Sequence, residues 1–202
     1  MKLKYLPLLT VLILFSLTAC TKQEPTGEDT TPTLPTFATH KTPWELLNEA
    51  IDNTKAAASC TVRYGTVEKQ GDTTTENIHS QTVTSEHPFD TDTLYQDVPS
   101  FPTNKDFLAD FCAMPLRVIP SNDGTFRYEL SELSWDEFCS LMYGSTTPAP
   151  MYEAFSQAQC IAAIDVDDHN RFYRLECTAV LGGAEDAPAR SLTFFLSVEQ
   201  FH

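Results

Sequence analysis

The sequence has few basic residues and few glycines, and its longest apolar run is too short for an ordinary membrane span. Lys and Arg number 13 against 28 Asp and Glu in 202 residues, for a net charge of −15. A chain this acidic repels phosphate backbones, which argues against nucleic-acid binding. The 7 glycines and 13 prolines are too few for a collagen-like or low-complexity chain. Aromatic residues make up 11%, enough bulk for one core, and the length favours one domain.

Recognisable catalytic and metal-binding motifs are missing as well. The chain contains no G-x-S-x-G, no H-E-x-x-H and no C-x-x-C sequence. We therefore predict a protein that is not an enzyme and that needs no cofactor and no metal. Adjacent acidic pairs such as Asp136 with Glu137 are explained more simply as solvated surface than as a glycosidase pair. A hydrolase whose catalytic residues lie far apart in the sequence is the alternative.

The segment from Asp165 to Glu176 has the end-to-end spacing of an EF-hand calcium loop but not its interior. His169 occupies a position that needs an oxygen ligand, and Asn170 replaces the glycine of the sharp turn. The flanking residues alternate like strands, whereas an EF-hand needs helices. The pattern predicts an acidic hairpin tip over 167–170.

The first twenty residues have the layout of a secretory signal. Lys2 and Lys4 precede an apolar run of about a dozen residues, which the small Thr18 and Ala19 follow. A helix of that length spans about 20 Å, short of the ~30 Å hydrocarbon core of a bilayer. A permanent transmembrane helix is therefore the weaker interpretation.

Leu17-Thr18-Ala19-Cys20 resembles the lipobox of bacterial lipoproteins. The resemblance implies cleavage between Ala19 and Cys20 and a diacylglyceryl group on the Cys20 sulfur, with palmitate-type acyl chains. Two acyl chains anchor a protein stably, which one chain does not. We expect a lipid-anchored protein on the extracytoplasmic side of a bacterial cell membrane. An ordinary signal peptide with an incidental cysteine is the alternative.

Three regions follow from this pattern: a signal peptide over 1–19, the lipidated Cys20 with a disordered tether over 20–41, and a single globular domain over 42–202. Residues 21–41 hold seven threonines and three prolines and show no periodic apolar face. Such a stretch cannot bury enough surface to offset the entropy of ordering it.

Three segments of the domain begin with helix-start signals. Each has Ser or Thr followed three residues later by an acid, the pattern of a capping box. The first runs from Thr42 to about Ala58 with Trp44, Leu47 and Ile51 on one face. The second starts at Thr103 with Asp106 and stops before Pro115, and the third starts at Ser134 with Glu137 and stops at Gly144.

Elsewhere the apolar residues recur with a period of two, as in strands. A strand near 60–65 precedes a polar, threonine-rich strand near 73–84, which we expect at an edge or facing solvent. The turn Asn122-Asp123-Gly124 sets the register of a hairpin. That register pairs Pro120 with Phe126, Val118 with Tyr128 and Leu116 with Leu130.

A three-strand meander ends the chain, and its first turn bears on the cysteines. Cys160, Ala162, Ile164 and Val166 form one strand face, and Tyr173, Leu175, Cys177 and Ala179 form the face of the next. A four-residue loop over 167–170 places Cys160 opposite Cys177, so these two are a candidate disulfide. The alternative is that all five cysteines after Cys20 are buried apolar residues. The third strand carries Leu192, Phe194, Leu196 and Val198.

The order of these elements predicts an α+β fold: a curved antiparallel, half-barrel-like sheet packed against an N-terminal helix and two shorter helices. With the lipobox and the hairpin pattern over 164–172, this order resembles the LolA/LppX-type half-barrel lipoproteins. The resemblance implies an apolar cavity for lipids and assigns no binding residue. We expect a non-enzymatic binding module for a lipid, another hydrophobic ligand or an envelope component. A structural or regulatory envelope protein that acts through protein contacts is the alternative.

Overall fold

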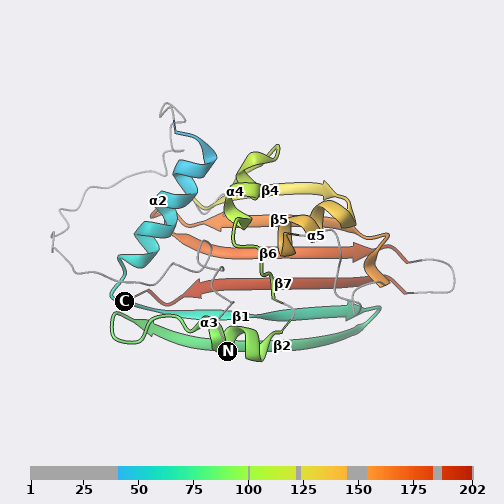
Figure 1. Cartoon of the computed structure of the whole chain (residues 1–202), viewed down its shortest axis with the longest axis horizontal. Coiled ribbons are helices and arrows are strands. Elements are labelled where there is room, and N and C mark those ends of the chain that lie inside the picture. Colours follow the sequence, from blue (N-terminus) through green and yellow to red (C-terminus); the bar gives the residue numbers. More distant parts are fainter. Residues whose placement is uncertain (1–40, 100, 122–123, 145–153, 184–187, 202) are drawn as a thin grey trace, which may run out of the picture.

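The computed structural model describes residues 41–99, 101–121, 124–144, 154–183 and 188–201. A seven-stranded antiparallel sheet carries helices on one face (Figure 1). The predicted signal peptide, Cys20 and nearly all of the tether lie outside the described residues. The elements are α2 (Pro43–Lys55), β1 (Ser59–Gln70), β2 (Thr73–Thr84), α3 (Thr91–Asp97), α4 (Phe107–Ala113), β3 (Arg117–Pro120), β4 (Phe126–Leu133), α5 (Trp135–Tyr143), β5 (Gln159–Val166), β6 (Phe172–Leu181) and β7 (Arg190–Glu199).

The strand order is β2-β1-β7-β6-β5-β4-β3, and each neighbouring pair is antiparallel. This confirms the predicted α+β fold with an antiparallel sheet. It also places β2 at an edge, as its polar sequence predicts. The last strand, β7, lies between β1 and β6 and so joins the two ends of the chain in one sheet.

Two of the three predicted helix starts are confirmed by reciprocal capping bonds. Glu45 N donates to Thr42 Oγ1 and Thr42 N donates to the Glu45 carboxylate, and Ser134 with Glu137 repeats this geometry at α5. Helix α2 ends at Lys55, three residues before the predicted Ala58. Its buried face includes Leu47 and Ile51, but the predicted member Trp44 is 38% exposed.

The predicted start of the second helix is wrong. Helix α4 begins at Phe107, and Asp106 at its N-cap makes no side-chain capping bond. Thr103 N instead donates to the carbonyl oxygen of Met142, and Asn104 Nδ2 donates to that of Leu141. The segment before α4 is therefore held by the end of α5, and tertiary contacts replace the local cap.

Helix α3 was not predicted. It is a short helix capped by Asp90, whose carboxylate accepts a bond from Asp92 N. Leu94 is buried, and the Tyr64 hydroxyl of β1 donates to Asp97 at 2.8 Å. The helix thus covers the helix-bearing side of β1 and β2.

The β3–β4 hairpin has the predicted register. Pro120 lies opposite Phe126 and Val118 opposite Tyr128, and Ser121 N donates to Thr125 O at 2.9 Å. Gly124 has a φ of +85°, which explains glycine at this turn position. The third predicted pair is not formed within the strands, because β3 begins at Arg117, after Leu116. Asn122 and Asp123 lie outside the described residues.

The predicted register of β5 and β6 is wrong by two residues along most of the pair. Cys160 lies opposite Ala179, and Cys177 lies opposite Ala162. The 167–170 turn forms, with Asn170 at a φ of +54°, but a bulge follows, and Tyr173 is the extra residue. Tyr173 is therefore 42% exposed, and Phe172 takes the buried place predicted for it.

The core lies between the sheet and the helices as one cluster of buried side chains. Phe107, Phe111 and Phe138 are among its largest fully buried side chains, and Leu192, Phe194, Leu196 and Val198 of β7 contribute as predicted. Among the described residues, none of the helices has both the length and the hydropathy to cross a bilayer.

Candidate functional site

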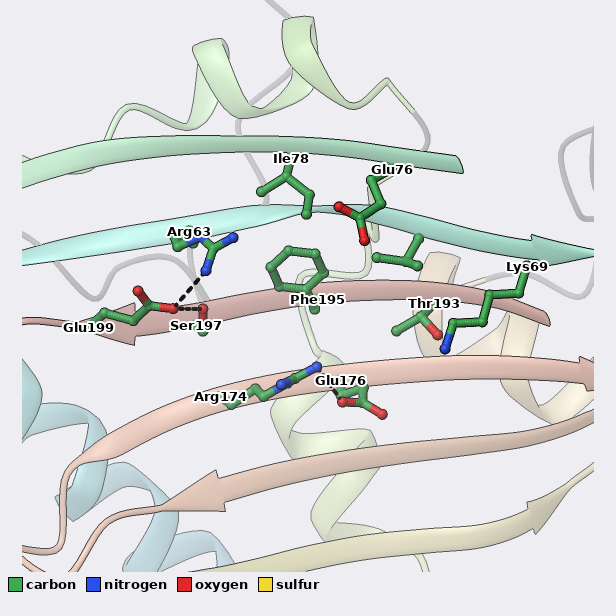
Figure 2. A pocket seen from close by; sticks show the side chains of 11 residues that line it. Arg63, Lys69, Glu76, Ile78, Arg174, Glu176, Thr193, Phe195, Ser197 and Glu199 are labelled. Carbon is green, nitrogen blue, oxygen red and sulfur yellow. Dashed lines mark hydrogen bonds and ion pairs between the residues drawn. The ribbon is translucent and has the colours of Figure 1, made fainter. Parts of the chain in front are cut away.

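The face of the sheet that bears no helices, here called the open face, carries most of the charged strand residues, and Figure 2 shows those around one depression on it. Alternating strand positions place both signs of charge there, as the strand period of two requires. The basic members are Arg63, Lys69, Arg117, Arg127 and Arg174, and the acidic members are Glu76, Glu129, Asp165, Glu176 and Glu199. These ten charges cancel, although the whole chain carries −15.

Arg127 is the centre of an ion-pair network on β4, β5 and β6. Its guanidinium lies 3.0 Å from Glu129, 3.2 Å from Asp165 and 3.9 Å from Glu176. Burial opposes the charge of Arg127, but the surrounding carboxylates, Asp165 first, raise its pKa above its usual value. Burial raises the pKa of Asp165, and Arg127 opposes that shift. On this half of the open face, the described acidic side chains are therefore already paired with arginine and are not available to a ligand.

The other half of the open face contains a depression of about 400 Å³ on β2, β1, β7 and β6. Phe195 forms its floor and is only 8% exposed. In the register Phe195 lies opposite Gly65, and Gly65 lies opposite Ile78 on β2. A Cβ at Gly65 would come within 2.0 Å of the Asn77 carbonyl oxygen, so only glycine fits there. The aromatic ring covers the gap that this glycine leaves.

Arg174 borders the depression and keeps one donor unused. One guanidinium nitrogen lies 2.6 Å from Glu176, and the guanidinium carbon is 5.7 Å from the centre of the Phe195 ring. Its Nε is buried without a hydrogen-bond partner among the described atoms. An unsatisfied buried donor costs about 1–3 kcal/mol, so an acceptor brought by a ligand would be favourable here.

The remaining charges of the depression are weakly engaged or free. The Arg63 guanidinium lies 3.4 Å from the Glu199 carboxylate, and the two side chains keep 44% and 34% of their surface exposed. Within the described part of the chain, Lys69 and Glu76 form no ion pair and no hydrogen bond through their side chains. Among the described residues, the depression therefore offers Lys69 and Glu76 as charged side chains without a partner, and both lie toward the β1–β2 hairpin end of the Phe195 floor.

The predicted Cys160–Cys177 disulfide is not formed. All five cysteines of the described domain are free thiols: Cys60, Cys112, Cys139, Cys160 and Cys177. Burial raises the pKa of Cys60, Cys112 and Cys139 to about 11 and that of Cys160 to about 12. Thiols with such pKa values stay protonated at neutral pH and are poor nucleophiles. The alternative, buried apolar cysteines, describes four of them, and Cys112 is partly buried.

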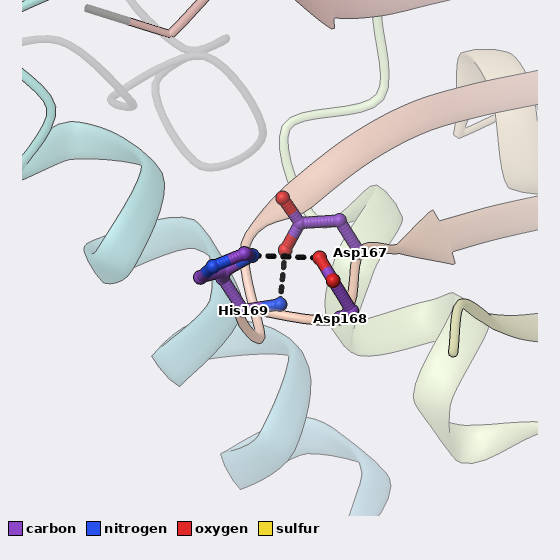
Figure 3. Close-up of side chains that lie close together, drawn as sticks. All are labelled: Asp167, Asp168 and His169. Carbon is purple, nitrogen blue, oxygen red and sulfur yellow. Dashed lines mark hydrogen bonds and ion pairs between the residues drawn. The ribbon is translucent and has the colours of Figure 1, made fainter. Parts of the chain in front are cut away.

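The hairpin tip holds a group of side chains whose ligand atoms lie within 4.8 Å of one another: Asp167, Asp168 and His169 (Figure 3). Asp167 is already engaged, because its carboxylate accepts bonds from the backbone N–H groups of His169 and Arg171 and from the Arg171 side chain. Asp168 lies 2.6 Å from His169 Nδ1. These contacts are those of a hairpin turn, and they agree with the predicted acidic tip.

Asp165 and Glu176, which have the spacing of the ends of an EF-hand loop, have a different role in the structure. Asp165 and Glu176 lie on neighbouring strands and both approach Arg127. The sequence carries a signal for this arrangement that our sequence analysis missed. Arg127 with Glu129 and Arg174 with Glu176 repeat a basic-x-acidic pattern within strands, which places each pair on one face. The adjacent acids Asp136 and Glu137 lie in the first turn of α5, where Glu137 serves the cap, and Glu185 and Asp186 are outside the described residues.

Comparison of the chain with protein families, with curated proteins and with solved structures found no match.

Proposed function

We propose that the protein is a membrane-anchored, extracytoplasmic binding module that holds a polar envelope component on the open face of its sheet. The expected diacylglyceryl group on Cys20 is the anchor, and the tether over 20–41 lifts the domain from the bilayer. The observation that supports the binding role is the depression around Phe195, where Lys69 and Glu76 have no side-chain partner among the described residues.

The arrangement of charges indicates the chemistry of the ligand. Lys69 and the unused Nε of Arg174 can take a carboxylate or a carbonyl oxygen, and Glu76 can take an ammonium group. Phe195 supplies an apolar contact beside these charges. A purely anionic ligand would meet the field of a chain with −15, whereas a ligand with both charges would not. A short peptide with free termini has this chemistry.

The lipid expected from the family resemblance requires an apolar cavity, and two features favour the polar ligand over it. The described depression is lined mainly by charged and hydroxyl side chains. The space between the sheet and the helices is occupied by one continuous cluster of buried residues. This cluster of buried residues also suits the alternative of a structural or regulatory protein, which would bind another envelope protein without a small ligand.

Two substitutions test the binding role, because neither residue supports the fold through an ion pair. Lys69→Met and Glu76→Gln should each weaken the binding of trialanine with free termini about tenfold, since each removes one charged contact. The measurement is a titration followed by backbone amide NMR shifts, which should map to the residues around Phe195. Lys105→Met and Glu86→Gln are matched controls, because both residues are exposed and lie outside the depression.

Three results would count against this proposal. Trialanine shifts far from Phe195, or equal affinities in all four variants, would remove the peptide site. Binding of palmitate that shifts core residues and ignores Lys69 and Glu76 would favour the lipid instead. Recovery of a protein partner in a salt-sensitive complex, with no small ligand bound, would favour the structural alternative.

A further inference from the structure

The edge strand β2 is long, regular and unprotected. Its register with β1 runs without a bulge from Gln70 opposite Thr73 to Ser59 opposite Thr84. On its outer side, Thr84 N is the one described backbone group with a backbone partner, His87 O at 2.9 Å. No other described residue forms a hydrogen bond with the remaining outer N–H and C=O groups of the strand, and such a row of backbone groups is a template for association.

The opposite edge of the sheet shows the protection that β2 lacks. Strand β3 has 4 residues, begins with Arg117 and ends with Pro120, so it offers little backbone for pairing. Strand β2 has 12 residues, no proline, and Glu76 as its one carboxylate. Because natural sheets protect their edges, a 12-residue edge without these features indicates a strand that is used for pairing.

The helix-bearing side of β2 is held in place, which leaves the edge ready to pair. Asn77 Nδ2 donates to the Asp97 carbonyl oxygen at 3.1 Å, and Gln81 exchanges hydrogen bonds with both backbone groups of Asp90. These contacts bind the strand to α3 and its leading turn. The strand therefore loses little conformational freedom when a partner adds to it.

We propose that β2 pairs with β2 of a second copy of this chain, so that the two sheets continue across a two-fold axis. Such an axis makes the contact isologous and the strands antiparallel. Residues directly opposite must share a face, and an axis at Ile78 meets this condition. It sets Ile78 against itself, Glu76 against Ser80 and Thr74 against Thr82.

The charges of β2 do not oppose a second copy at this edge. In the register centred on Ile78, the two Glu76 side chains face Ser80 and not each other. Two chains of −15 repel each other over most of their surfaces, and β2 is a stretch where they can meet with no like charges opposite. The threonines that dominate the strand also pair well across strands.

Substitutions at Ser80 test the pairing, because the residue is exposed and lies outside the depression around Phe195. Within the chain Ser80 lies opposite Arg63 on β1, and across the axis it lies opposite Glu76 of the second copy. Ser80→Glu should therefore stabilise the monomer and raise the dissociation constant of the dimer about fivefold. Ser80→Lys should destabilise the monomer and lower that constant by a similar factor. A merely structural effect would change stability and association together.

The experiment uses the chain from position 20 with Cys20→Ser, which keeps every described residue and excludes association through acyl chains. Sedimentation velocity over a range of concentrations gives the dimer constants, and hydrogen exchange at low and high concentration gives the protection of the β2 amides. Gln159→Glu and Gln159→Lys are the matched charge controls, because Gln159 is an exposed strand residue far from β2 in the strand order.

We expect concentration-dependent dimers, protection of β2 amides that grows with them, opposite shifts for the two Ser80 variants, and no shift for the Gln159 variants. A chain that stays monomeric at millimolar concentration would overturn the proposal, as would a strand that pairs only with another protein. Dimers without protection of β2, or Ser80 variants that shift the dimer constant in the same direction, would overturn it too.

Discussion

At the residue scale, Arg127 is the side chain on which the open face depends most. Three carboxylates within 4 Å share its guanidinium, and Asp165 and Glu129 keep only 16% and 15% of their side-chain surface exposed. Their mutual repulsion is offset by Arg127 and, at Glu176, by Arg174 as well. A neutral side chain at 127 would leave Glu129 and Asp165 as two neighbouring negative charges that have lost their nearest cation.

We predict that Arg127→Met lowers the free energy of unfolding at pH 7 by about 2 kcal/mol, since partly buried charges lose their partner. The measurement is urea unfolding. Arg63→Met is the matched control and should cost under about 1 kcal/mol, because its single pair is exposed. A loss as small as that of Arg63→Met would contradict the central role of Arg127.

The same variant should have a distinct pH dependence. Burial already raises the pKa of Asp165, and loss of Arg127 raises it further. The folded chain then binds a proton more readily than the unfolded chain, in which Asp titrates near pH ~3.9. The free energy of unfolding therefore falls as the pH rises from the pKa of the unfolded Asp to the raised pKa of folded Asp165. The loss of stability caused by Arg127→Met should accordingly be smaller at pH 4 than at pH 7. Asp165→Asn added to Arg127→Met should recover part of the loss.

At the element scale, α5 shows how local chemistry fixes a boundary. Ser134 and Glu137 exchange hydrogen bonds at its start, and Gly144 ends it in the left-handed conformation with a φ of +66°. The Ser134 hydroxyl and backbone amide lower the pKa of Glu137, because both bonds favour the charged form. The helix packs Phe138 and Met142 into the core against β4 and β5.

We predict that Ser134→Ala lowers the free energy of unfolding by about 1 kcal/mol, because it removes the acceptor of the Glu137 N–H group. The change should appear as a lower urea midpoint with an unchanged slope. Ser134→Thr keeps the acceptor and should stay within a few tenths of a kcal/mol of the parent. Asp106→Ala at α4 should also have a small effect, because Asp106 makes no capping bond.

At the scale of the whole molecule, the position of the protein in the cell depends on one predicted modification. Cys20→Ala should leave the chain unprocessed or release it from the membrane fraction, since it removes the sulfur that would carry the acyl chains. The measurements are membrane fractionation and intact mass of the purified chain. The lipoprotein assignment would be wrong if the mass of the parent chain corresponds to a first residue other than Cys20. It would also be wrong if that mass does not include at least two acyl groups.

Particular elements show how far the sequence predicts the fold. The caps of α2 and α5, the β3–β4 turn and the edge position of β2 were correctly predicted, because each depends on residues within a few positions of one another. The start of α4 was wrong, because its segment is held by carbonyl groups of α5. The β5–β6 register was wrong, because the bulge at Tyr173 follows from packing and not from the turn.

The candidate site was less accessible from the sequence than the fold. Arg127, Asp165 and Glu176 are up to 49 residues apart, and the local basic-x-acidic patterns place charges on strand faces without indicating which strands are neighbours. Gly65 and Phe195 meet only because β7 enters the sheet beside β1. Each of these residues looks like ordinary strand surface when it is seen alone.

The sequence by itself determined the caps of α2 and α5, the register of the β3–β4 hairpin and the alternation that puts charge on one face of the strands, because these follow from hydrogen bonds and side-chain spacing along the chain. Only the tertiary structure decided which strands are neighbours, and so which charges are paired around Arg127 and which have no partner among the described residues beside Phe195. Strand order depends on the burial of the whole apolar cluster at once, and no short segment contains that information.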